Sequence, residues 1–153
     1  MFRSLMIGAV SVAALTMAAS AFAQQAKYGT PAEAKAMLEK AVVAVKADKA
    51  KALASFNAGT DGFKDRDLQP FCFNKSDGIL NATTNPSILG KDVRSLKDKT
   101  GKAFGEENFK AAVDGKITEV SYLFPRPGET EPVAKVSYVT GVGDQGCGVG
   151  YYK

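Results

Sequence analysis

Histidine and tryptophan are absent from this chain of 153 residues, and cysteine occurs only twice. Without histidine, the chain lacks both the commonest transition-metal ligand and the commonest general base at neutral pH. Two cysteines alone make a poor metal site, and Cys72 and Cys147 are too far apart for a redox CxxC motif. The sequence also contains no nucleophile elbow, no Walker A lysine loop and no dinucleotide-binding fingerprint. We therefore expect no enzyme activity, no metal site and no cofactor.

A strong excess of charge of one sign is also missing. The chain has 20 basic and 16 acidic residues, and its lysines are scattered along the sequence. A nucleic-acid-binding surface needs a concentrated basic face with interleaved aromatic residues. The composition therefore predicts no nucleic-acid partner.

The first 23 residues form a hydrophobic leader. Arg3 supplies a positive start, residues 5–18 are uncharged and largely apolar, and Ala21-Phe22-Ala23 has the small-x-small pattern of a signal peptidase site. The apolar run is shorter than the roughly 20 residues that span a bilayer. We therefore predict a signal peptide over 1–23, cleavage after Ala23, and one exported domain over 24–153 without a membrane span. An uncleaved N-terminal anchor is the alternative.

The next segment has the pattern of a long helix. Thr30 is suited to cap it, Pro31 to occupy its first position, and Glu33 to complete a capping box. Apolar residues then recur at helical spacing: Ala34, Met37, Leu38, Ala41, Val42 and Val45. Asp48 can cap a second helix over 49–56 that Gly59 ends, although one long bent helix fits equally well.

Strand patterns follow in the rest of the chain. We predict strands over 71–73, 79–83, 116–124, 133–142 and 147–152, a short helix over 104–113, and a four-residue turn over 143–146. Consecutive strands with short connections favour an antiparallel sheet. With the long helix on one face, the fold class is α+β.

Both cysteines lie in the part of the chain that we expect to be exported. An even number of cysteines in an exported protein favours a disulfide. The alternative is a pair of separate, buried, reduced thiols, because the sequence alone gives no geometry.

An ordered series of short motifs resembles a known family, the stand-alone periplasmic single Cache domains (type 2). The motifs are, in order, Ala54-Ser55-Phe56-Asn57, Asp65-Arg66-Asp67-Leu68, Phe71-Cys72-Phe73, Asn85-Pro86, Leu89-Gly90-Lys91-Asp92, Leu96-Lys97-Asp98, Tyr122-x-Phe124, Glu131-Pro132, Lys135-Val136-Ser137-Tyr138-Val139 and Gly148-Val149-Gly150-Tyr151. No single motif is specific; their order and spacing are.

The resemblance implies a PAS-like, five-stranded antiparallel sheet with a long N-terminal helix packed on one face. The first and last strands would be neighbours at the sheet centre, which would bring Cys72 and Cys147 together as a disulfide. Family members are periplasmic sensors, and their known ligands are mostly small carboxylates or similar metabolites, held between a sheet face and the helix and loops that cover it. Many relatives carry a histidine where this chain has Ala82, and an aromatic residue near Glu119 is missing, which puts ligand specificity in doubt.

The resemblance and the residue types together suggest a binding site for a small anion. Lys135 is the candidate cation, because it occupies the family's Lys-x-x-Tyr position. Tyr122 and Tyr138 are candidate hydrogen-bond donors, and Phe124 is a candidate pocket wall. Arg126 follows in a Pro-rich loop, where a guanidinium can hold a carboxylate with two hydrogen bonds. Each has a structural alternative, as a core or solvent-exposed side chain.

The acidic residues around Arg66 point to a local ion pair rather than a site. The Asp65-Arg66-Asp67 run lacks the regular oxygen spacing and distal glutamate of an EF-hand. We therefore expect Arg66 to pair locally or to lie in a solvated turn.

The hypothesis is a periplasmic sensor domain that binds a small, anionic metabolite and signals through a separate membrane receptor or sensor kinase. The alternative is a ligand-free envelope interaction module with a Cache fold and a closed pocket. A small redox protein that uses its two cysteines is a third and weaker alternative.

Overall fold

The computed structural model describes residues 26–153. The predicted signal peptide and its cleavage after Ala23 lie outside this range. Within it, no helix has the length and the apolar character needed to cross a bilayer. The elements are α1 (Pro31–Ala47), α2 (Lys49–Ala58), β1 (Pro70–Asn74), β2 (Leu80–Ala82), the short 3-10 helix η1 (Val93–Ser95), α3 (Phe104–Ala111), β3 (Thr118–Pro125), β4 (Pro132–Val142) and β5 (Gln145–Tyr152).

The five strands form one antiparallel sheet in the order β2-β1-β5-β4-β3. The predicted α+β class and five-stranded antiparallel sheet are therefore confirmed. The turn between β4 and β5 is shorter than predicted, because β5 already begins at Gln145 and only Gly143 and Asp144 connect the strands. Gly143 adopts a positive φ of 61°, which a tight two-residue hairpin turn requires.

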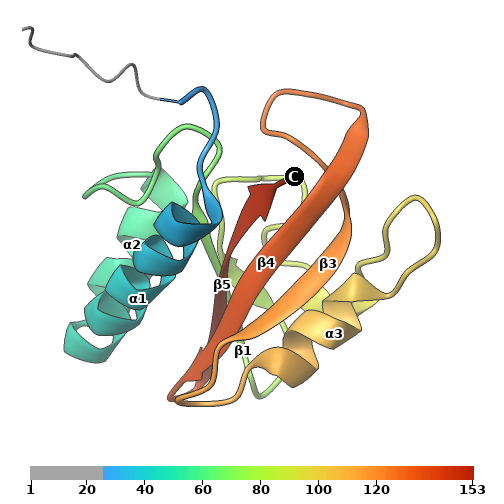
Figure 1. Ribbon diagram of the computed structural model, residues 1–153. Coiled ribbons are helices and arrows are strands. Elements are labelled where there is room, and N and C mark those ends of the chain that lie inside the picture. The colour runs from blue at the N-terminus through green and yellow to red at the C-terminus, as the bar shows by residue number, and fades with distance from the viewer. Residues whose placement is uncertain (1–25) are drawn as a thin grey trace, which may run out of the picture.

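The helices α1 and α2 cover one face of the sheet (Figure 1). The predicted capping box is present: the Glu33 N–H donates to Thr30 Oγ1 over 3.2 Å, and the Thr30 N–H donates to Glu33 Oε2 over 2.8 Å. Two helices form rather than one bent helix, because Asp48 leaves helical geometry and its carboxylate accepts the Lys51 N–H at 3.0 Å. The apolar stripe of α1 packs against β5 in one core cluster.

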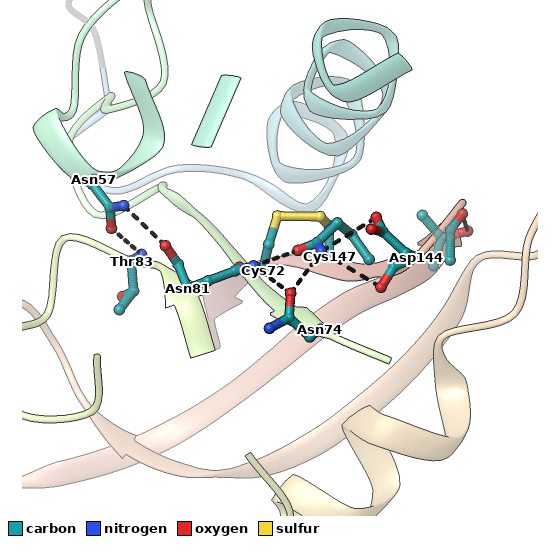
Figure 2. The surroundings of a disulfide bond; sticks show 10 residues. Asn57, Cys72, Asn74, Asn81, Thr83, Asp144 and Cys147 are labelled. Atoms are coloured by element: carbon teal, nitrogen blue, oxygen red, sulfur yellow. Dashed lines mark hydrogen bonds between the residues drawn. A yellow bond between two sulfur atoms is a disulfide. The ribbon is translucent and has the colours of Figure 1, made fainter. Parts of the chain in front are cut away.

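A disulfide joins the two central strands within this core. Cys72 of β1 lies directly opposite Cys147 of β5, with 4.1 Å between their Cα atoms, and neither residue is exposed. Figure 2 shows the bond beneath the helical layer. The predicted bridge and the predicted adjacency of the first and last strands are both confirmed.

The opposite face of the sheet has a different cover. Here α3 and η1 pack against aromatic side chains of β1 and β3, forming two further core clusters. In Figure 1, α3 lies on the other side of the strands from α1 and α2. One face of the sheet is therefore covered by α1 and α2, and the other by α3 and η1.

Arg66 ties the segment before α1 to the rest of the domain. Its guanidinium lies 2.8 Å from Glu33 Oε1 and 2.8 Å from Asp65 Oδ2, and it donates to the carbonyl of Tyr28 over 2.9 Å. The expected local ion pair is confirmed. The hydrogen bond from Arg66, with those from Thr30, lowers the pKa of Glu33 from 4.5 to about 2.

Replacing Arg66 with glutamine should flatten the acid dependence of stability. A carboxylate with a lowered pKa contributes stability that is fully present above its unfolded-state pKa of 4.5 and is lost as the pH falls through about 2. Thermal unfolding between pH 5 and pH 2 measures this, and Arg66→Gln should lose fewer degrees over that range than the unaltered protein. Glu33→Gln is the matched control and should flatten the same range. An unchanged slope in both variants would contradict the assignment.

Candidate functional site: a cationic pocket on the sheet

A cavity of about 610 Å³ lies on the face of the sheet opposite α1. All five strands contribute to its floor, including Phe71 of β1 and Leu80 of β2; α3 contributes Phe104 and Asn108, and the loops 83–88 and 126–129 complete its walls. No residue of α1 or α2 lines it. The expected pocket between a sheet face and a covering helix is present, but that helix is α3 rather than the long N-terminal one. The reason is that the apolar stripe of α1 packs directly against Cys72, Cys147 and Val149, which leaves no space for this cavity between α1 and the sheet.

The charged residues of this lining are mostly cationic. Lys64, Lys97, Arg126 and Lys135 line the cavity together with a single carboxylate, Glu129. An excess of positive charge at a concave, partly apolar surface favours anionic ligands.

Lys135 lies at the floor of the cavity, between two tyrosines. The strand register places it directly opposite Tyr122 of β3 and Tyr152 of β5. Its ammonium is 4.9 Å from the ring centroid of Phe124, 5.0 Å from that of Tyr152 and 6.0 Å from that of Tyr122. Among residues 26–153 it has no carboxylate within 4.0 Å and no hydrogen-bond acceptor. The ammonium therefore lies against aromatic rings, and the one carboxylate that acts on it electrostatically, Asp67, lies beyond 4.0 Å.

Burial is the main influence on the protonation of Lys135. Desolvation disfavours the charged amine and lowers its pKa from 10.5 to about 8, while the carboxylate of Asp67 acts in the opposite direction. The amine is still largely protonated at neutral pH. An anion bound beside it would add a directly contacting countercharge, which Asp67 does not supply.

Tyr122 and Phe124 also line the cavity, as their predicted shared face of β3 requires. The Tyr122 ring stacks on Phe104 with 4.1 Å between centroids, and its hydroxyl lies 2.8 Å from Ser137 Oγ. Burial raises the pKa of this phenol to about 12. The hydroxyl thus already has a protein partner, so Tyr122 is placed to shape the wall.

Arg126 lies where the loop after β3 meets the cavity. Its guanidinium carbon is 4.4 Å from the ring centroid of Tyr28 and 5.1 Å from that of Tyr152. Its nearest carboxylate within 4.0 Å is Glu129, at the limit of an ion pair. The buried Nε atom has no hydrogen-bond partner among the described residues. The structure thus brings Arg126 and Lys135 to the same cavity, each about 5 Å from the ring centroid of Tyr152 (5.1 and 5.0 Å).

Tyr138 does not belong to this site. Side chains alternate between the two faces of a strand, so Lys135 and Ser137 face the cavity while Tyr138 faces α1. Its ring packs on Tyr151, 5.6 Å away between centroids. The expectation that Tyr138 donates a hydrogen bond in the same pocket as Lys135 is therefore corrected by strand parity.

Tyr152 and Asn108 are among the lining residues that sequence reasoning missed. Tyr152 pairs with Lys135 across the β4–β5 hairpin, so counting outward from a two-residue turn at Gly143 and Asp144 would have found it. Asn108 is only 2% exposed, and its Oδ1 has no partner within the described part of the chain. Nothing in the sequence marks this asparagine, because only the packing of α3 brings it over the sheet.

The same described range contains no group of three or more acidic, histidine or cysteine side chains arranged to hold a metal ion. The lining instead combines four cations and one carboxylate with aromatic, aliphatic, amide and hydroxyl side chains.

Comparisons with solved structures find the same fold among bacterial chemotaxis proteins. A methyl-accepting chemotaxis protein from Vibrio parahaemolyticus is 24% identical with a TM-score of 0.62, over 79% of this chain and 86% of that chain. A periplasmic sensor domain of a chemotaxis protein is 25% identical with a TM-score of 0.57, over 78% and 87% of the two chains. A Cache chemosensory domain described for its carboxylic acid recognition is 24% identical with a TM-score of 0.56, over 78% and 85%.

A curated relative and a family model extend the comparison to sequence. The methyl-accepting chemotaxis protein McpP of Pseudomonas putida is 36% identical over 55 residues, which are 36% of this chain and 10% of that protein. The matched part thus spans about a tenth of the curated relative. The sequence model described as "Cache domain" matches residues 19–151. With its sheet order, its disulfide-linked central strands and this match, the chain belongs to the Cache domain family.

Proposed function

We propose that this protein is a periplasmic sensor domain that binds a small carboxylate, or a similar small anion, in the cavity above β3, β4 and β5. The observation that supports this most directly is the ammonium of Lys135, which lies at the cavity floor with no carboxylate of the described residues within 4.0 Å; the charge of Asp67 acts on it only from farther away. A desolvated cation without a partner is costly, and a carboxylate would offset that cost with charge-assisted hydrogen bonds.

The size of the cavity supports a ligand rather than a closed core. Small-molecule sites are commonly between 300 and 1,000 Å³, and this cavity measures about 610 Å³. The alternative of an interaction module with a closed pocket has no support from a cavity of this size. The similar proteins are chemotaxis proteins, one of them described for carboxylic acid recognition, and this is consistent with a sensor that acts through a membrane partner.

A thermal-shift screen of the purified protein tests this function. The probes are acetate, propionate, pyruvate, lactate, succinate and malate, with the corresponding amides and alcohols as uncharged controls. A ligand at about 100 times its dissociation constant stabilises the folded protein by about 2.7 kcal/mol, which raises the melting temperature by roughly 10 °C. The uncharged controls should have no effect. Absence of a shift with every anion would refute the proposal.

The affinity for an effective anion should fall at alkaline pH. Only the protonated amine of Lys135 attracts the ligand, and its pKa in the free protein is about 8. From pH 6.5 to pH 9.5, the protonated fraction drops about 30-fold and the dissociation constant should rise by a similar factor. Isothermal titration at the two pH values measures it. A constant affinity across this range would show that the charge of Lys135 does not take part.

A further inference from the structure

The strand that forms the cavity floor beneath Lys135 carries a row of glycines. Gly146, Gly148 and Gly150 alternate along β5 and all face away from α1, whereas Cys147 and Val149 face the helical core. A β-carbon at Gly146 would collide with the Phe73 ring, and one at Gly148 would collide with the ring of Phe71. Each glycine thus accommodates a large side chain that crosses β5 from a neighbouring strand.

At Gly150 the crossing side chain is Lys135. A β-carbon there would lie less than 3.0 Å from Lys135 Cε and 2.7 Å from Ser137 Oγ. Gly150 pairs with Ser137, so Lys135, which pairs with Tyr152, is its diagonal neighbour. A long side chain can reach such a diagonal position. The aliphatic stem of Lys135 therefore lies flat across the bare backbone at Gly150.

Backbone conformation does not explain why position 150 is a glycine. Gly150 is not among the glycines with a positive φ, so alanine could adopt its backbone conformation. The requirement for glycine is one of space above the strand. The nearest movable obstacle to a larger residue is the stem of Lys135.

We propose that Gly150 is a positioning residue of the binding site: by having no side chain, it lets Lys135 lie across β5 with its ammonium inside the cavity. A β-carbon at position 150 lifts the stem away from the sheet and moves the ammonium out from between Phe124 and Tyr152. This proposal rests on the proposed anion-binding role of Lys135. The proposal adds that Gly150, a residue with no side chain, determines the position of the Lys135 ammonium.

The test follows the titration of Lys135 by NMR in protein labelled with ¹³C at the lysine ε-carbons, with no ligand added. In the unaltered protein one lysine should titrate near pH 8, and its signal should be absent from Lys135→Ala. In Gly150→Ala that signal should move towards the ordinary value near 10.4, because the amine gains water. The charged groups around it, Asp67, Arg126 and Glu129, are the same in both proteins.

Gly146→Ala is the matched control, since it adds the same methyl group on the same face of β5 but meets Phe73 and Ala112 instead of Lys135. It should lower the melting temperature and leave the Lys135 titration near pH 8. If Gly150→Ala is folded and Lys135 still titrates near 8, the proposal is wrong.

A second measurement covers the case in which Gly150→Ala folds poorly. We compare the decrease in melting temperature that Gly150→Ala causes in two backgrounds: the otherwise unaltered protein, and the Lys135→Ala variant, which lacks the lysine stem. If Gly150 acts through Lys135, the loss in the Lys135→Ala background should be at most half as large. An equal loss, or failure to fold in both backgrounds, would overturn the proposal.

The binding readout separates this proposal from the proposed function. An anion that shifts the unaltered protein should bind Gly150→Ala at least tenfold more weakly and Gly146→Ala within about threefold of normal. If no anion binds the unaltered protein, the proposed function fails, whereas the titration of Lys135 still reports whether Gly150 positions the amine.

Discussion

Replacing Cys72 and Cys147 together with alanine should lower the free energy of unfolding by about 4–5 kcal/mol. The bond joins residues 75 positions apart, and the chain-entropy estimate for a loop of that length gives this magnitude. Domains of this size are stable by only about 5–15 kcal/mol in total, so the loss should be about a third of the stability or more. Urea unfolding followed by circular dichroism measures it.

The control for this prediction is a reducing agent. Dithiothreitol should destabilise the unaltered protein towards the level of the double variant and leave the variant itself unchanged. Because both cysteines are fully buried between α1 and the sheet, reduction of the folded protein should be slow and should accelerate as it unfolds. A double variant within about 1 kcal/mol of the unaltered protein would show that the hydrogen-bonded ladder between β1 and β5 suffices without the bond.

Replacing Lys135 with methionine should reduce the ligand-induced thermal shift by half or more without destabilising the free protein. Loss of a hydrogen bond to a charged group costs about 1.5–3 kcal/mol, which corresponds to a 10- to 150-fold weaker affinity. The free protein should be as stable as before or more stable, because the substitution removes a partly buried ammonium that no described carboxylate contacts within 4.0 Å and keeps the apolar stem. Isothermal titration and thermal unfolding measure the two effects separately.

Lys97→Met is the matched control for Lys135→Met. Lys97 lines the rim of the same cavity but is exposed, so removing it should weaken binding by less than about threefold. Equal losses in the two variants would mean that the cavity attracts anions through its overall charge. Unchanged binding in Lys135→Met would remove this lysine from the site.

Local patterns were enough to predict the elements of the fold. The start of α1 was predictable because Thr30, Pro31 and Glu33 form contacts within a single turn of chain. The end of α2 was predictable for the same reason, since Gly59 takes the left-handed conformation with which helices commonly stop. Strand boundaries were less accurate, and β5 begins two residues earlier than predicted because Gln145 pairs with Val142 at once.

The strand order came from resemblance rather than from local pattern. Nothing in the neighbourhood of Cys72 or of Cys147 indicates that β1 pairs with β5. That pairing depends on contacts between segments far apart in sequence. Residue spacing alone therefore could not distinguish a disulfide from two separate reduced thiols.

Some residues of the candidate site could likewise be predicted from the sequence, and others could not. The family resemblance together with residue type identified Lys135, and the alternation of β3 placed Tyr122 and Phe124 on one face; the structure brings the three residues to the same cavity. Tyr138 was misplaced because the Lys-x-x-Tyr spacing is odd and puts the two side chains on opposite faces. Strand parity alone was sufficient to detect this.

By itself, the sequence determined that histidine chemistry is absent, that capped helical segments precede five strands, and that a lysine and an arginine flank an aromatic strand. These features depend on residue type and on contacts within a few positions. Only the tertiary structure decided which face of the sheet is hollow, that α3 rather than α1 covers it, and that Gly150 lies beneath Lys135. The reason is physical: a cavity exists where side chains from distant segments fail to fill the space between them, and no local pattern encodes that volume.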